Sequence, residues 1–148
     1  MTLWREATAA DVPAVVAMLT DDMLGAAREG SDMALYQAEF AEMQRLGANT
    51  LVVGEQAGHI VATYQITILH GLSQKAARRA QIEAVRVAGD LRGQGLGREL
   101  MADAEARARA AGCRLMQLTT NKARTRAHRF YDRLGFTPSH IGYKRELD

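Results

Sequence analysis

The sequence has little cysteine, little proline and few aromatic residues, and these shortages exclude several classes of protein. The single cysteine, Cys113, rules out an intrachain disulfide and any zinc site built from several thiolates. With 2 prolines and 47% hydrophobic residues, the composition excludes a collagen-like repeat and is atypical of a disordered chain. A length of 148 residues predicts one globular domain, residues 1–148.

Long apolar runs are missing as well. Arg5 and Glu6 stand where a signal peptide would need an apolar stretch. No segment approaches the roughly 20 apolar residues that span a bilayer. We therefore expect a cytoplasmic protein without a membrane segment, and a reducing compartment suits its lone cysteine.

The charges nearly balance, but they are unevenly distributed. Nineteen basic and 17 acidic residues leave a net charge of +2, which is no argument for nucleic acid binding. Residues 1–60 hold three basic and nine acidic residues, whereas residues 109–148 hold nine and three. This polarity would draw a polyanion to the C-terminal half and a cation to the N-terminal half. Alternatively, both halves present ordinary solvated faces.

Hydrophobic spacing predicts an α/β (α+β) fold with the order α, α, β, β, β, α, β, α, β, β. The predicted helices cover residues 9–20, 31–46, 96–111 and 127–134, and the predicted strands cover 51–54, 60–69, 81–87, 114–119, 136–137 and 140–146. We expect a mixed sheet with helices on both faces. Within it, residues 81–119 should form a right-handed parallel crossover.

A glycine-rich turn, Arg-Gly-Gln-Gly-Leu-Gly at residues 92–97, joins a predicted strand to a predicted helix. Its glycines let a ligand approach the backbone, and free N–H groups at a helix start bind anions. Arg92 and Arg98 can add charge-assisted contacts. The spacing is not that of a P-loop or of the G-x-G-x-x-G dinucleotide motif, and residues 113–117 lack a ribose-binding acid. A tight packing turn without a ligand is the alternative.

Three segments resemble the GCN5-related N-acetyltransferase (GNAT) family, in the family's order. Residues 92–97 fit its (Gln/Arg)-x-x-Gly-x-(Gly/Ala) signature, residues 82–87 resemble its central strand, and residues 127–136 resemble its late helix. The resemblance implies a mostly antiparallel sheet of six to seven strands with a splayed central parallel pair. It also implies acetyl-coenzyme A (acetyl-CoA) as co-substrate and direct acetyl transfer to an amine, so Cys113 is not expected to be a nucleophile.

The resemblance also assigns the cofactor contacts. The pyrophosphate would lie against Arg92, Gly93, Gln94, Gly95, Leu96, Gly97 and Arg98, and the pantetheine arm along Val85, Arg86 and Val87. An extended pantetheine has two amides that can pair with a splayed strand as an added strand would.

Two side chains are candidates for proton transfer. A primary amine with a pKa of about 10.4 is neutral in only about one molecule in two thousand at pH 7, so a base is useful. Glu83 is the candidate base, directly or through water; strict alternation would place it on one face with Val85 and Val87. Tyr131 resembles the family tyrosine proposed to protonate the leaving thiolate. The alternatives are a surface or ion-paired glutamate and an ordinary core tyrosine.

The late helix departs from the common family pattern. Many members have an asparagine seven residues before the tyrosine, where this chain has Arg124, and Asn121 lies three residues earlier. The run Asn-Lys-x-Arg-x-x-Ala-His-x-Phe-Tyr resembles a subgroup that includes aminoalkylphosphonate acetyltransferase-like proteins. Asn121 or Arg124 is therefore expected to contact the cofactor or the acceptor, with a surface role as the alternative for Arg124.

Two segments that frame the acceptor in the family carry opposite charges here. Residues 20–46 are rich in acids and favour a cationic amine, whereas Lys75, Arg78 and Arg79 favour an anionic group on the acceptor. We expect a small primary amine. The alternatives are a peptide or protein acetyltransferase and a non-catalytic acyl-CoA sensor.

No nucleic acid partner is expected, because the basic segment 122–133 lacks a recognition motif. No metal is expected either, because the four histidines (59, 70, 128 and 140) lack metal-ligand spacing. The resemblance makes a homodimer possible.

Overall fold

The computed structural model describes residues 1–22 and 24–148, which form two compact units, Met1–Gln117 and Leu118–Asp148. The single domain of residues 1–148 stays a prediction. No helix among the described residues is long and apolar enough to cross a membrane.

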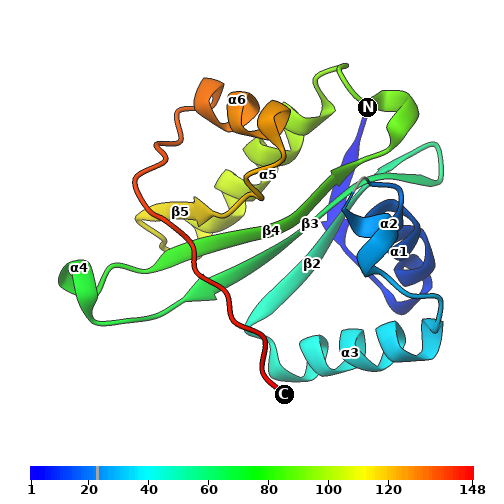
Figure 1. Cartoon of the computed structure of the whole chain (residues 1–148), viewed down its shortest axis with the longest axis horizontal. Helices are drawn as coiled ribbons and strands as arrows, with labels where there is room; N and C mark the ends of the chain where they lie inside the picture. Colours follow the sequence, from blue (N-terminus) through cyan, green and yellow to red (C-terminus); the bar gives the residue numbers. More distant parts are fainter. Residues whose placement is uncertain (23) are drawn as a thin grey trace. The chain divides into compact units, whose positions relative to one another are not determined.

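The described strands form one five-stranded sheet in the order β1-β2-β3-β4-β5 (Figure 1). Its strands are β1 (Leu3–Glu6), β2 (Asn49–Gln56), β3 (His59–Leu69), β4 (Arg79–Val87) and β5 (Leu115–Leu118). Neighbours from β1 to β4 are antiparallel. Helix α5 (Leu96–Ala110) links β4 to β5, as is typical of a parallel crossover. The predicted mixed, mostly antiparallel sheet is therefore confirmed.

Helices of the first unit cover both faces of this sheet. They are α5 on one face and α1 (Val12–Thr20) and α3 (Met33–Leu46) on the other. The unit also has the short helices α2 (Gly25–Arg28) and α4 (Ser73–Ala76), α4 lying in the connection between β3 and β4, and 3-10 turns at Ala9–Asp11 and Gly89–Leu91. Val53 of β2 belongs to a core cluster with residues of α1 and α3, such as Val16 and Phe40. On the other face, the Tyr64 hydroxyl of β3 donates to Asp103 of α5 at 2.5 Å. Successive strand residues point to opposite faces, so α5 lies across the sheet from α1 and α3.

The predicted count of six to seven strands is wrong for the described chain, which has five. The short strand β1 was not predicted, and the two closing strands predicted at 136–137 and 140–146 are not formed. In the second unit, helix α6 (Thr125–Arg133) precedes a segment without helix or strand. Ile141 and Tyr143 alternate as in a strand but are 72% and 91% exposed. Alternation forms a strand only where a neighbouring strand takes up the backbone hydrogen bonds.

The predicted connection over residues 70–79 contains a left-handed turn. Gln74, Lys75 and Ala76 have φ angles of 55°, 61° and 58°. This conformation costs a non-glycine residue about 1–2 kcal/mol. No hydrophobic pattern signals such a turn, so α4 was not predicted.

Candidate functional site

A β-bulge interrupts β4 next to Glu83. Glu83 pairs with Gln65 of β3, but Thr63, two residues before Gln65, pairs with Arg86, so β4 holds one extra residue. Ala84 takes up the irregularity with a φ of 52°. Paired residues of neighbouring strands share a face, so Glu83 lies on the same face as Arg86, whereas Val87 lies on the other. The expectation that Glu83 shares a face with Val87 is therefore wrong, because the bulge shifts the alternation.

The face that carries Glu83 is polar along β4. Arg79 and Gln81 precede Glu83 at alternate positions, and Gln117 of β5 links them. An Arg79 N–H donates to the Gln117 Oε1 at 3.0 Å, and the Gln117 Nε2 donates to the Gln81 Oε1 at 2.7 Å. Within residues 1–22 and 24–148, the exposed Glu83 carboxylate has neither a hydrogen bond nor an ion pair, so it is open to water or to an amine.

The end of β4 extends past β5. The Arg114 N–H donates to the Arg78 carbonyl at 2.8 Å, which places the two strand starts side by side. Because β4 has nine residues and β5 has four, the segment 84–87 runs beyond the last residue of β5. Backbone groups on that edge can pair with an extended ligand that carries amides.

The glycine-rich turn keeps its backbone donors open. Gly93 and Gly95 have φ angles of 81° and 85°, and a Cβ on either would meet nothing within 4 Å. Glycine is therefore favoured at both positions because of the backbone conformation, and not because a side chain would collide with a neighbour. In the described part of the chain, no N–H group from Gly93 to Arg98 donates to a protein acceptor. These donors lie at the start of the 15-residue helix α5, where the helix dipole favours an anion.

Two arginines expected at the cofactor contact an acidic pair at the end of α1. Arg92 donates to the carbonyls of Val87 and Asp21 at 3.2 and 3.1 Å. Arg86 lies 3.6 Å from the Asp22 carboxylate, and both side chains of this pair are largely buried. These contacts tie the end of α1 to the end of β4. The expected cofactor contacts of both arginines stay predictions, and nothing in the sequence spacing indicated the acidic partners.

Two other turn side chains differ in their contacts. The Gln94 side chain donates to the Asp90 carbonyl at 3.3 Å. Arg98 is exposed, and no contact of its side chain with another described residue is present. Arg98 is thus the turn's charged side chain that is free to meet an incoming anion.

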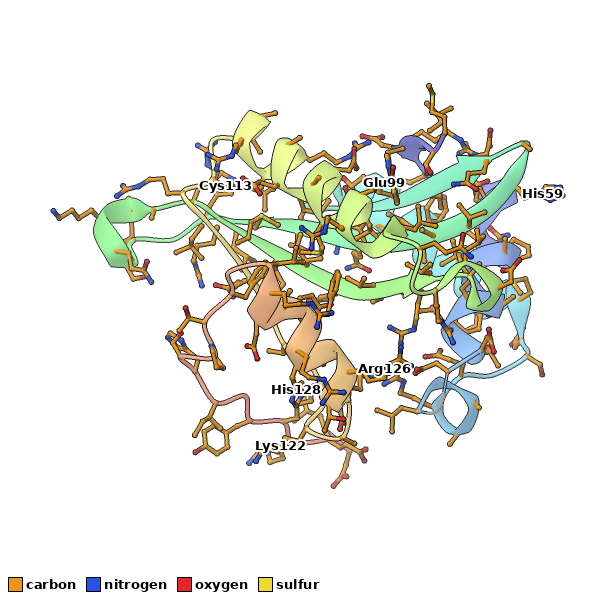
Figure 2. All side chains as sticks on the ribbon, turned by 90° about the horizontal axis from the view of Figure 1, so that it is seen from above. His59, Glu99, Cys113, Lys122, Arg126 and His128 are labelled. Atoms are coloured by element: carbon orange, nitrogen blue, oxygen red, sulfur yellow. The ribbon has the colours of Figure 1, made fainter. Side chains whose placement is uncertain are left out.

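The remaining expected residues lie in the second unit. Tyr131 packs edge-on against Phe130 and Phe136, with ring centroids 5.2 and 5.8 Å apart. The Asn121 Oδ1 accepts a hydrogen bond from the Ala123 N–H at 2.9 Å, just before α6. Figure 2 shows Arg126 and His128 on this helix. Tyr131 as a partner of Glu83 and the ligand roles of Asn121 and Arg124 stay predictions, because these three residues belong to the second unit and Glu83 to the first.

Cys113 lies just past the end of α5 (Figure 2). Burial raises the pKa of its thiol, and the charge of Arg78 lowers the pKa less. A thiol with a raised pKa is protonated at neutral pH and is a poor nucleophile. Among the described residues, no group of three His, Cys, Asp or Glu side chains could hold a metal.

Neither of two surface hollows in the first unit includes Glu83. The larger, about 360 Å³, lies between α3 and β2 and includes Phe40 and Gly47. The smaller, about 270 Å³, borders the glycine-rich turn at Gln94 and Gly95. The larger hollow has no charged side chain except Glu6, so its size alone does not indicate chemistry. The candidate site is therefore assigned from the bulge, the open edge of β4 and the turn.

This arrangement agrees with a family comparison. The model of the acetyltransferase (GNAT) family matches residues 14–136. The chain belongs to the GNAT family. The family uses acetyl-CoA as acetyl donor, so the predicted family and co-substrate are confirmed.

Three known proteins are similar to this GNAT chain. It is 38% identical over 94 residues to the aminoalkylphosphonate N-acetyltransferase of Salmonella typhimurium, covering 64% of this chain but only 58% of that protein. It is 40% identical to a solved Bacillus halodurans protein described as a transcriptional regulator, with a TM-score of 0.95 over 99% of this chain and 100% of the other. A predicted acetyltransferase from Clostridium acetobutylicum, solved with acetyl-CoA, shares the fold at 17% identity, with a TM-score of 0.75 over 97% and 96% of the two chains.

Proposed function

We propose that this GNAT protein transfers an acetyl group from acetyl-CoA directly to a primary amine of a small metabolite. The observation that carries the proposal is the exposed Glu83 carboxylate beside the bulge at Ala84, where β4 begins to extend past β5. A carboxylate without an ion pair can accept a proton, and the neighbouring open strand edge can hold an extended cofactor.

Acetyl-CoA would contact two parts of the first unit. The open N–H groups from Gly93 to Arg98 would bind the pyrophosphate at the start of α5. The pantetheine amides would pair with the backbone of residues 84–87. In this arrangement the thioester would lie next to the bulge and therefore near Glu83.

The transfer removes two protons from the ammonium nitrogen and adds one to the sulfur. Glu83, directly or through a water molecule, takes a proton from the ammonium group, and the amine nitrogen attacks the thioester carbonyl carbon. The carbon–sulfur bond then breaks, and Tyr131 gives its proton to the leaving thiolate. The new amide nitrogen loses its second proton to water, from which the Tyr131 phenolate regains a proton. The demand on this acid is small, because a thiol with a pKa of about 8.5 already leaves readily as an anion.

The relatives and the charges favour an acceptor that carries both an amine and an anionic group. The Salmonella relative is named for an aminoalkylphosphonate substrate. The acid-rich segment 20–46 suits the cationic amine, and the basic side chains around β4 suit the anion. We propose that the reaction takes place in the cytoplasm. The family resemblance is compatible with a homodimer.

An amine panel tests the proposed function. The full chain is incubated with acetyl-CoA and with small amines, aminoalkylphosphonates, lysine peptides and N-terminal peptides, and the release of free thiol is measured. We expect turnover with small amines. Turnover confined to peptides would instead identify a peptide or protein acetyltransferase and overturn the proposal.

A non-catalytic acyl-CoA sensor is the second candidate, favoured by the Bacillus halodurans relative described as a transcriptional regulator. Cofactor binding requires only the turn and the β4 edge, so a sensor would bind acetyl-CoA tightly. It would release no thiol with any amine, and Glu83→Gln would not change its behaviour. An enzyme loses turnover in the same variant while still binding acetyl-CoA.

Tyr131→Phe tests the general acid. We expect turnover to fall by about 10²-fold or less, since the range for general acids is roughly 10²–10⁴ and the thiolate leaves readily. Acetyl-CoA binding should stay intact, which calorimetry checks. A far larger loss with intact binding would contradict the modest role given to Tyr131.

A further inference from the structure

Arg79, on the Glu83 face, combines two properties that no other of the eleven arginines of the first unit has: it is half-buried, and it lacks an ion pair with a described residue. Seven of them have a carboxylate within ion-pair distance: Arg5, Arg28, Arg45, Arg86, Arg92, Arg107 and Arg109. The other four have none among the described residues; of these, Arg78, Arg98 and Arg114 are exposed, whereas Arg79 is half-buried. A guanidinium has five N–H donors, and the side-chain hydrogen bond of Arg79 to Gln117 uses one of them.

The Arg79 side chain is nevertheless held in place. Its guanidinium donates to the Gln117 Oε1 at 3.0 Å, and the Gln117 Nε2 donates to the Gln81 Oε1 at 2.7 Å. The first bond fixes the amide orientation of Gln117, because a guanidinium cannot accept a hydrogen bond. A fixed cation with open donors is ready for an anion, since little side-chain freedom is lost on binding.

The position of Arg79 relates it to Glu83. Arg79, Gln81 and Glu83 occupy alternate positions of β4 before the bulge, so their side chains leave one face of the sheet. With a rise of about 3.3 Å per residue, the Cα atoms of Arg79 and Glu83 are about 13 Å apart. The side chain of arginine can close part of that distance. An amine at Glu83 and an anionic group at Arg79 can therefore belong to one small molecule.

Two neighbouring basic side chains do not have these properties. The Arg78 guanidinium donates to the Ala111 carbonyl, and Lys75 lies on the exposed left-handed turn of α4. Both side chains are more exposed than that of Arg79, so water weakens their attraction for an anion.

We infer that Arg79, positioned by Gln117 and Gln81, binds a phosphonate or carboxylate group of the acceptor and so determines its specificity. The inference rests on the proposed acetyl transfer. Arginine suits this role because its planar fork matches both oxygens of such a group. The simpler alternative is that the three side chains only tie β4 to β5.

The test compares two amines that differ in one group, 3-aminopropylphosphonate and propylamine. The variants are Arg79→Ala and, as a matched control, Arg114→Ala. Arg114→Ala removes the same charge at a position next to β4, since the Arg114 backbone N–H donates to the Arg78 carbonyl. The Arg114 side chain is exposed and contacts no described residue. KM and kcat are measured for both amines.

We expect Arg79→Ala to raise KM for the phosphonate about 10- to 100-fold, as for the loss of a charged hydrogen bond, with kcat and the propylamine constants little changed. Arg114→Ala should change KM less than about threefold. Equal effects on both amines, equal effects of both variants, or no preference of the unmodified protein for the phosphonate would overturn the inference.

Two further measurements separate a failure of this inference from misfolding of a variant and from a failure of the proposed function. If Arg79→Ala fails to fold, Arg79→Lys takes its place. This variant keeps the charge, so the KM for the phosphonate should rise, but less than the roughly 10- to 100-fold expected for Arg79→Ala. Calorimetric binding of methylphosphonate needs no turnover: unmodified protein and Arg114→Ala should bind it equally, and Arg79→Ala should not. Absence of thiol release with intact methylphosphonate binding would overturn acetyl transfer alone, whereas equal binding by all three proteins would overturn the role of Arg79.

Discussion

The two faces of β4 differ in burial and in proposed function. On one face Ala80 and Ile82 are buried to 0% and 1% exposure, and on the other Arg79, Gln81 and Glu83 are polar and solvent-accessible. The partners differ accordingly, because α5 packs on the sheet face of the apolar side chains. One strand thus supplies the core and the candidate site, separated by a single residue along the chain. Substitutions at adjacent positions should therefore damage different properties.

The largest effect is expected at Glu83. Glu83→Gln removes the proposed base and should lower kcat by about 10²–10⁴-fold with small amines. Thermal unfolding should be unchanged, because the carboxylate is exposed and has no described partner. Steady-state rates and a melting curve check the two halves of this prediction. A variant that keeps full activity would remove Glu83 from the mechanism.

Ile82→Ala is the matching change on the other face. Loss of this fully buried side chain should lower the free energy of unfolding by about 2–5 kcal/mol, because it leaves a cavity in the packing against α5. Denaturant titration measures it. The specific activity of the fraction that stays folded should be nearly normal. A large loss of kcat without loss of stability would break the division between the faces.

Gly95→Ala separates backbone conformation from side-chain chemistry in the turn. A φ of 85° disfavours alanine, so the free energy of unfolding should fall by about 1–2 kcal/mol, or the turn should rearrange. Rearrangement would move the open N–H groups and weaken acetyl-CoA binding, which calorimetry measures. Gly30→Ala is the control, since this glycine is outside the left-handed region and has nothing within 4 Å.

The smallest expected effect concerns a paired carboxylate, in contrast to the open Glu83. Hydrogen bonds from Arg5 lower the pKa of Asp11, with a smaller contribution from the Thr8 backbone, while burial opposes them. A carboxyl with a lowered pKa stabilises the fold above its unfolded pKa of about 3.9, and this contribution is lost as the pH falls through the lowered value. The unfolding free energy should therefore decrease below about pH 4, and less steeply in Asp11→Asn. Equal slopes for both proteins would contradict this role of Asp11.

Local patterns carried most of the prediction. Alternating apolar residues located β3 and β4, helical spacing located α1, α3, α5 and α6, and the spacing of the glycines located the turn before α5. The closing strands failed because Ile141 and Tyr143 alternate without a strand beside them among the described residues. β1 was not predicted because a strand of four residues is too short to show a clear alternation of apolar and polar residues.

The order of α1, α3, β2, β3, β4, α5, β5 and α6, the anion-ready turn and the family followed from the residues alone, because hydrophobic period and glycine conformation are local properties of the chain. Only the tertiary structure decided which side chains share a face: the bulge at Ala84 separates Glu83 from Val87, and the pairing of β4 with β5 brings Gln117 to Arg79. These facts depend on register between segments far apart in sequence. A one-residue shift in register moves every later side chain to the opposite face of the sheet.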